Sequence, residues 1–160
     1  MILQLRIDER LVYKQVCAAW LEFLKASHLL IANDYVESNE NQKTLMSLTI
    51  PRNVKHLFTT VDRAIEIMND PKAASLKIFP IVKTPADALK ILNSVEGIND
   101  VVFGKFGSQT PLDKSTLVKP CQGVAFDAEN VALVKQIKEK IKKDIFFQDV
   151  PSAEAFKLNF

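Results

Sequence analysis

A charged loop near the start of the chain carries the residues best suited to chemistry. Residues 6–16 read Arg-Ile-Asp-Glu-Arg-Leu-Val-Tyr-Lys-Gln-Val. The loop follows an apolar run and leads into a segment with helical spacing, so backbone N–H groups at the helix start can bind an anion. Lys14 adds a positive charge there, although a lysine in such a loop is more often simply solvated. The chemistry to expect here is the binding of a small anionic group.

Other kinds of site have little support in the sequence. Cys17 and Cys121 have no further cysteine or histidine at metal-ligand spacing, and small apolar thiols are the favoured interpretation. Cys17 lies one turn into the helix, where a helix start can lower the pKa of a thiol, but a core position is favoured. His28 and His56 fall within expected strands, away from the loop. With no Walker, Rossmann, Gly-x-Ser-x-Gly or His-Glu-x-x-His motif, no metal and no cofactor is predicted.

Composition indicates one globular domain spanning residues 1–160. Apolar residues make up 48 % of the chain and charged residues 25 %, which excludes a disordered or fibrous protein. The 21 basic and 19 acidic side chains nearly balance, so net charge gives no reason to expect a nucleic-acid partner. The first apolar run is too short for a signal peptide, and none is long enough to span a bilayer. The expected location is the cytoplasm.

Apolar runs of strand length alternate with segments of helical period along the whole chain, which predicts an α/β fold with parallel strands. Thr84 and Asp127 are predicted N-caps, and Pro80 has to lie at a sheet edge or where no donor is needed. Expected strands cover residues 2–7, 28–33, 54–58, 76–82, 98–106, 118–126 and 144–150. Expected helices follow residue 16 and cover residues 37–48, 61–68, 84–95, a long segment from 127 and a short one from 151.

Ligands of such sheets bind at the C-terminal ends of the strands. Four segments are expected to meet there: the 8–15 loop, residues 33–34, residues 83–84 and the turn at Gly104. The crevice between them is the predicted binding site.

The run at residues 6–16 resembles the active-site loop of the IIB components of mannose/sorbose-type sugar phosphotransferase systems. That loop typically reads Arg-Ile-Asp-Asp-Arg-Leu-Ile-His-Gly-Gln-Val, and its histidine carries the phosphoryl group. Counterparts of other family positions cover essentially the full length of the chain. They are Trp20, residues 31–34, Pro51, residues 83–85 and residues 102–104.

The resemblance implies the sorbose-type IIB fold, an open, mostly parallel twisted sheet of about seven strands with helices on both faces. It assigns Arg10 to steady the phosphoryl oxygens, because a guanidinium presents a rigid fork of donors. The residues expected to bind phosphate are Arg10, Lys14, Gln15 and Thr84. Asp8 and Asp34 are expected to orient Arg10 and the loop, because their charges repel a dianion.

The resemblance also implies partners. A IIA component would donate the phosphoryl group, and a membrane IIC/IID complex would hold the sugar, so the protein is expected to associate with a membrane transporter complex. The identity of the sugar and the oligomeric state, a homo-oligomer included, stay open.

Tyr13 stands where the family carries its phosphorylated histidine, and Lys14 where it carries a glycine. A neutral imidazole attacks a phosphoryl group without first losing a proton, whereas a phenol, with a reference pKa of about 10, is almost fully protonated at neutral pH. The change predicts a degenerate or regulatory homologue. Two alternatives stay open: an active phosphocarrier that uses another acceptor residue, and an α/β domain outside the system that binds another small anion.

Overall fold

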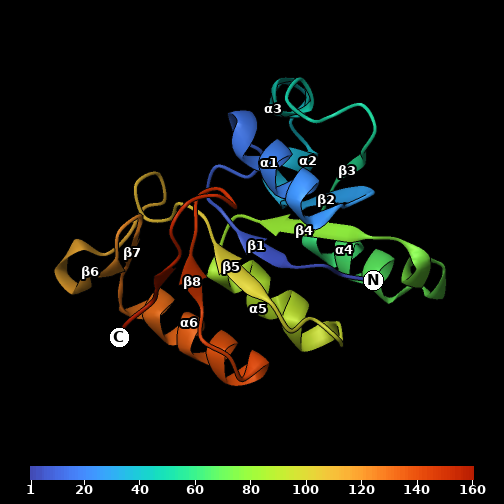
Figure 1. Ribbon diagram of the computed structural model, residues 1–160. Helices are drawn as coiled ribbons and strands as arrows, with labels where there is room; N and C mark the ends of the chain where they lie inside the picture. Colours follow the sequence, from blue (N-terminus) through green and yellow to red (C-terminus); the bar gives the residue numbers. More distant parts are fainter.

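The computed structural model describes residues 1–160 and has one seven-stranded sheet at its centre (Figure 1). The strand order is β3-β2-β4-β1-β5-β8-β9, with parallel pairing throughout except between β8 and β9. The strands are β1 Leu5–Ile7, β2 His28–Ala32, β3 Lys55–Thr59, β4 Ile78–Val82, β5 Val101–Phe103, β8 Phe146–Phe147 and β9 Phe156–Lys157. The predicted α/β class with a mostly parallel sheet is confirmed.

Helices cover both faces of the sheet, and each face has its own core (Figure 1). The helices are α1 Lys14–Leu24, α2 Asp34–Glu37, α3 Glu40–Ser47, α4 Val61–Asn69, α5 Pro85–Ser94 and α6 Ala128–Ile141. The larger core lies under α4, α5 and α6, and the smaller one under α1 and α2. Because it is covered on both sides, the interior strand β4 is buried at all five positions. No helix is both long enough and apolar enough to cross a membrane.

The predicted N-caps are confirmed. The Thr84 hydroxyl accepts a hydrogen bond from the backbone N–H of Asp87, and the Asp127 carboxylate accepts one from that of Asn130. These caps occupy N–H groups that a helix leaves free at its start. They fix where α5 and α6 begin.

The helix expected over residues 37–48 is shorter, because α3 begins only at Glu40, and a separate short helix, α2, precedes it at Asp34–Glu37. Asn33 caps α2, and Asn39 caps α3 by accepting a hydrogen bond from the N–H of Gln42. Asparagine favours caps over helix interiors, because its side chain competes for nearby backbone groups. Asn39 therefore starts a second helix.

Pro80 lies inside the sheet, so the edge position considered for it is wrong. It pairs with Leu30 of β2, whereas the pairing between β4 and β1 begins one residue later, at Ile81 and Arg6. The missing N–H of the proline is tolerated at this point of the ladder.

Two expectations for the last third of the chain are wrong. Residues 118–126 form a hairpin outside the main sheet, with β6 Val118–Cys121 and β7 Val124–Phe126 joined by a turn in which Gly123 has a φ of +93°. The segment from residue 151 has no helix and returns as β9 beside β8. The Gln148 side chain holds that return by donating to the carbonyls of Pro151 and Ala153 at 3.1 and 2.9 Å.

Candidate functional site

The 8–15 loop leaves the C-terminal end of β1 and is tied to both neighbouring strands. The N–H of Asp8 donates to the carbonyl of Val82 at 2.9 Å, and that of Glu9 donates to Lys105 at 3.0 Å. Gly104 passes so close that a Cβ there would overlap the Asp8 carboxylate. The loop therefore lies where the sequence predicts the binding crevice.

Arg10 is held by two carboxylates. Its Nε donates to Asp8 Oδ1 at 2.9 Å, and its Nη2 donates to Asp8 Oδ2 and to Asp149 Oδ1, both at 2.8 Å. Burial lowers the pKa of Arg10, but the hydrogen bonds and charges of Asp8 and Asp149 outweigh it and raise the pKa above its ordinary value. Arg10 is thus a permanent cation with two of its nitrogens engaged.

A second arginine, Arg6, holds the Asp8 carboxylate that binds Arg10. The Arg6 side chain is 1 % exposed and donates to Asp8 Oδ2 at 3.2 Å and to the carbonyls of Gln148 and Asp149 at 3.0 Å. Its guanidinium lies 5.1 Å from the ring of Trp20, whose Nε1 also donates to the Asp149 carbonyl, at 2.8 Å. Burial lowers the pKa of Arg6, an effect that the Asp8 charge opposes. The turn after β8 is therefore anchored beside the loop.

Tyr13 is the last residue before α1 and has an extended backbone. Its side chain is partly exposed, and its ring lies under two cations, 4.6 Å from Arg10 Cζ and 5.1 Å from Lys14 Nζ. Its hydroxyl has no hydrogen-bond partner within the protein. Lys14 has a φ of +45°, a left-handed conformation that favours glycine.

Glu9 is a buried member of the loop that sequence reasoning did not select. The residue is 2 % exposed, and its carboxylate accepts hydrogen bonds from residues of the 107–110 loop, which follows β5. Asp149 was also missed, since nothing in the sequence around it suggests contact with residue 10. Two features of the sequence could have indicated Glu9. One is its place in the charged loop, between Asp8 and Arg10, and the other is the presence of two hydroxyl residues, Ser108 and Thr110, after a predicted strand.

The structure places the other predicted residues at the margins of the site. Gln15 is exposed and lines a groove of about 690 Å³ between α1 and Pro51. Thr84 is occupied as the cap of α5. Asp34 accepts a hydrogen bond from the N–H of Val61, the first residue of α4, at 2.9 Å, and it forms no hydrogen bond or ion pair with Arg10. The expectation that Asp34 orients Arg10 is therefore wrong.

The region around Thr84 is acidic. Burial raises the pKa of the Asp87 carboxyl, and the negative charge of nearby Asp34 adds to that rise, against the opposing effects of the hydrogen bond with Thr84 and the charge of Lys90. Two carboxylates close to Thr84 disfavour a dianion at that hydroxyl.

The remaining candidate nucleophiles do not join the site. Cys17 is 2 % exposed, and burial raises the pKa of its thiol to about 12. His28 opens β2 and hydrogen-bonds Ser27 at 2.8 Å, while His56 of β3 contacts Ser47 at 3.3 Å. No group of three or more His, Cys, Asp or Glu residues is arranged to hold a metal ion.

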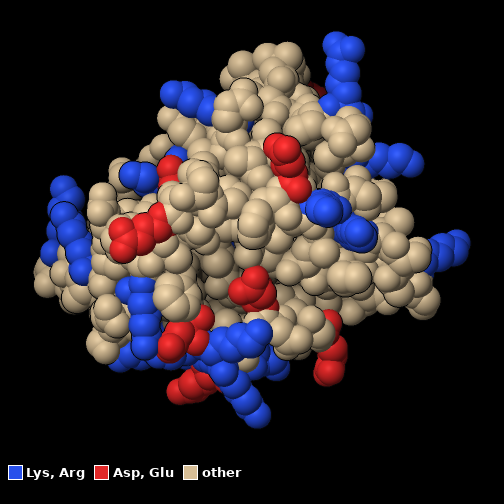
Figure 2. All heavy atoms as spheres, in the orientation of Figure 1, with Lys and Arg blue, Asp and Glu red and all other residues tan.

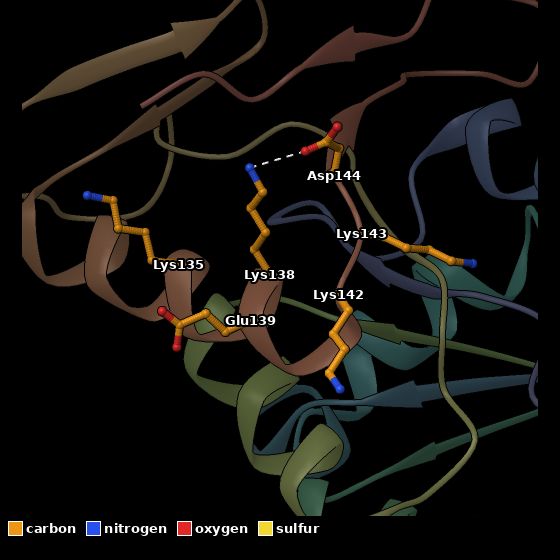
Figure 3. A pocket seen from close by; sticks show the side chains of 6 residues that line it. All are labelled: Lys135, Lys138, Glu139, Lys142, Lys143 and Asp144. Carbon is orange, nitrogen blue, oxygen red and sulfur yellow. Dashed lines mark ion pairs between the residues drawn. The ribbon is translucent and has the colours of Figure 1, made fainter.

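A hollow lined mainly by lysines lies elsewhere on the surface. Lysines gather over α6, at the lower left of Figure 2. A hollow of about 560 Å³ there is lined by Lys135, Lys138, Glu139, Lys142, Lys143 and Asp144. Of the lysines that line the hollow, Lys138 alone pairs with Asp144, at 3.1 Å, and Figure 3 shows the others pointing in different directions. The hollow surrounds the end of α6, at the sheet edge opposite the 8–15 loop, and it forms no converging anion site.

Comparison with known sequences identifies the family. The model of the phosphotransferase system (PTS) sorbose subfamily IIB component matches residues 2–159. A probable phosphotransferase enzyme IIB component of Streptococcus pyogenes serotype M6 is 34 % identical over 155 residues, which cover 95 % of this chain and 93 % of that protein. The N-acetylgalactosamine-specific phosphotransferase enzyme IIB component 2 of Escherichia coli K12 is 31 % identical over 154 residues, covering 96 % and 93 %.

Solved structures agree. The N-acetylgalactosamine-specific IIB component 1 from Escherichia coli superposes with a TM-score of 0.84 at 28 % identity, covering 98 % of each chain. The IIBSor domain of the sorbose permease from Klebsiella pneumoniae has the same fold, with a TM-score of 0.83 at 21 % identity, covering 97 % of this chain and 91 % of that one. Membership of this family implies IIA, IIC and IID partners in general. The chain belongs to the sorbose subfamily of IIB components of the phosphotransferase system.

Proposed function

We propose that this chain is a IIB component that has lost its phosphoryl carrier and acts as a regulatory or competing partner in a mannose/sorbose-type sugar phosphotransferase system. In this proposal Tyr13 occupies the position of the family's phosphohistidine. The observation that carries the proposal is the environment of Tyr13, whose hydroxyl forms no hydrogen bond to a base and whose ring centroid lies 4.6 Å from Arg10 Cζ.

The chemistry of a phenol supports this proposal. To accept a phosphoryl group, Tyr13 would have to transfer its proton to a base, because a protonated phenol is a poor nucleophile. The carboxylates of Asp8 and Asp149 are both engaged with Arg10. The resulting phosphate ester would also be a slower donor to a sugar hydroxyl than a phosphoramidate is.

The charge balance around Arg10 also supports the loss of the phosphoryl carrier. The positive charges of Arg6 and Arg10 are matched by the negative charges of Asp8 and Asp149. An arriving phosphoryl dianion would have to compete with both carboxylates for the same N–H groups while being repelled by them. Lys14 is the one additional cation of the loop beside Tyr13.

No other residue is a good substitute acceptor. Cys17 is buried as a protonated thiol, and His28 and His56 lie on strands outside the loop. The alternative of an active carrier with a different acceptor therefore lacks a supporting observation.

The preserved loop suits a protein that still docks. A IIA component has to bring its phosphohistidine to residue 13, so the surface that it contacts surrounds the 8–15 loop. This loop is held by hydrogen bonds to Val82, Lys105 and Asp149. We infer that the chain binds IIA without accepting its phosphoryl group, and that it competes with a histidine-bearing IIB component beside the IIC/IID complex.

Intact-mass spectrometry tests this proposal. The protein is incubated with phosphoenolpyruvate, the general phosphotransfer proteins and its cognate IIA, beside the variants Tyr13→His and Tyr13→His/Lys14→Gly. We expect no added phosphoryl group on the unmodified protein and one on the double variant, in which the glycine also restores the backbone freedom of the loop. Labelling of the unmodified protein would overturn the proposal.

A competition assay tests the regulatory role. The unmodified protein is added in increasing amounts to a histidine-bearing IIB component that receives phosphate from IIA. We expect a slower transfer as its concentration rises, and no slowing from a control variant in which Gln15→Glu and Ala18→Glu place negative charge on the first turns of α1, next to the loop. An unchanged rate at all concentrations would rule out competition for IIA.

A further inference from the structure

The Glu9 carboxylate is enclosed by four consecutive residues. It accepts hydrogen bonds from the backbone N–H groups of Gly107, Ser108, Gln109 and Thr110 at 3.0, 3.0, 3.1 and 3.1 Å. The hydroxyls of Ser108 and Thr110 donate to it as well, at 2.7 and 2.8 Å. Each carboxylate oxygen therefore accepts three hydrogen bonds, and no basic side chain takes part.

Consecutive backbone N–H groups that point to one centre form an anion-binding concavity. The 107–110 loop is such a concavity, and a carboxylate fills it. Burial would raise the pKa of Glu9, but the hydrogen bonds from Ser108, Thr110 and the backbone outweigh burial and lower it to about 2. Glu9 is consequently ionised at neutral pH.

The hairpin of β6 and β7 fixes the path of the 107–110 loop on the side away from Glu9. Gly107 has a φ of +99°, and a Cβ there would overlap the carbonyl oxygen of Ala125 in β7. The neighbouring Phe106 exchanges backbone hydrogen bonds with Gly123 and Ala125. The loop is thus packed against the hairpin, and Glu9 is its link to the 8–15 loop.

Glu9 lies in the chain between Asp8 and Arg10, the arginine that Asp8 holds. Asp8 receives the Arg10 side chain and its backbone N–H, the latter at 3.0 Å. The Glu9 side chain points instead to the 107–110 loop. One carboxylate thus holds the arginine, and the next ties the whole loop to the sheet edge after β5.

We propose that the 107–110 loop is an oxyanion-binding site whose resident ligand is the Glu9 carboxylate, and that Glu9 is thereby the positioning residue that holds the 8–15 loop. This role does not depend on whether Tyr13 carries a phosphoryl group. It goes beyond the carrier position and assigns a ligand class, carboxylate, to a loop that makes no contact with Arg10.

Chemical rescue in the full-length protein tests the proposal. Glu9→Ala empties the concavity, and formate is small enough to take the place of the missing carboxylate. Backbone hydrogen exchange is followed by NMR at residues 107–110 and at residues 10–11, with and without sodium formate, and sodium chloride keeps the ionic strength constant. The matched control is Glu96→Ala, which removes an exposed glutamate that has no ion pair.

We expect exchange at residues 107–110 to be at least about tenfold faster in Glu9→Ala than in the unmodified protein, because four N–H groups lose their acceptor. Exchange at residues 10–11 should also rise, because their loop loses its tie. Formate should slow exchange at both places in Glu9→Ala and leave Glu96→Ala unchanged. Equal responses to formate in the two variants would overturn the oxyanion site, and unchanged exchange at residues 10–11 would overturn the positioning role.

A milder pair of variants covers the case in which Glu9→Ala does not fold. Glu9→Gln keeps the size of the side chain but replaces one acceptor oxygen with an amide that faces N–H donors, whereas Glu9→Asp keeps the charge. We expect fast exchange at residues 107–110 in Glu9→Gln and partial recovery of protection in Glu9→Asp. Equal protection in both variants would show that the carboxylate is not the ligand.

Discussion

The guanidinium of Arg10 lies over the ring of Tyr13, with 4.6 Å between Cζ and the ring centroid. Asp8 and Asp149 engage its edge, and the Arg10 side chain is 9 % exposed. The cation that the family motif assigns to phosphate is therefore enclosed by two carboxylates and an aromatic ring. Four predictions follow from this arrangement and from the loop around it.

Tyr13 should contribute to stability through cation–π contacts with its ring and not through its hydroxyl. Tyr13→Leu removes the cation–π contacts with Arg10 and Lys14 and should lower the free energy of unfolding by about 0.5–1 kcal/mol. Tyr13→Phe keeps the ring and loses a hydroxyl without a hydrogen-bond partner, so it should be nearly neutral. Urea unfolding of both variants checks this, and an equal loss in both would contradict it.

Lys14→Gly should stabilise the protein. Lys14 has a φ of +45°, which costs a residue with a Cβ about 1 kcal/mol and costs glycine little. Lys14→Ala removes the charge but keeps the Cβ, so it should give no such gain. A rise in the midpoint of thermal unfolding for the glycine variant alone is the expected result; a rise for both would point to the charge as the source of strain.

The two carboxylates that hold Arg10 should differ in their importance. Asp8 is fully buried between Arg6 and Arg10, so Asp8→Asn leaves the Arg6 cation without its partner and should cost about 3–5 kcal/mol. The Asp149 side chain is 37 % exposed, and its loss should cost about 1 kcal/mol or less. Denaturant unfolding of Asp8→Asn and Asp149→Asn measures both costs, and similar values would be inconsistent with this structure.

Glu9 should make stability depend on pH in the acid range. Its pKa is lowered from 4.5 to about 2 in the folded protein, so its contribution is complete above pH 4.5 and is lost as the pH falls towards 2. A pKa shift of this size corresponds to a contribution of about 3 kcal/mol to the free energy of unfolding.

The free energies of unfolding of the unmodified protein and of Glu9→Gln, measured at pH 6 and at pH 3, check that the contribution of Glu9 falls as the pH is lowered. Glu9→Gln has no charge to lose at this position, so its stability should change less over the interval than that of the unmodified protein. Asp127 and Asp144, whose pKa values hydrogen bonds also lower, contribute equally to both proteins and cancel in the difference. Parallel pH profiles would mean that Glu9 is not the titrating group.

The sequence alone determined the features that depend on local pattern. Alternation of apolar runs and helical segments specifies a parallel α/β sheet, because each segment has to bury its apolar side on the next layer. The caps at Thr84 and Asp127 were predictable because a cap involves residues three apart. The run from Arg6 to Val16 indicated the family, and Tyr13 within it raised the question of function.

Only the tertiary structure decided which side chains surround that run. Asp149 reaches Arg10 across 139 residues, and the 107–110 loop reaches Glu9 across about a hundred. No local pattern encodes such contacts, because they depend on the placement of β5 beside β1 and of β8 beside β5. The last segment shows the same limit: residues 156–157 form a strand because β8 offers an unpaired edge, and that edge exists only once the sheet has formed.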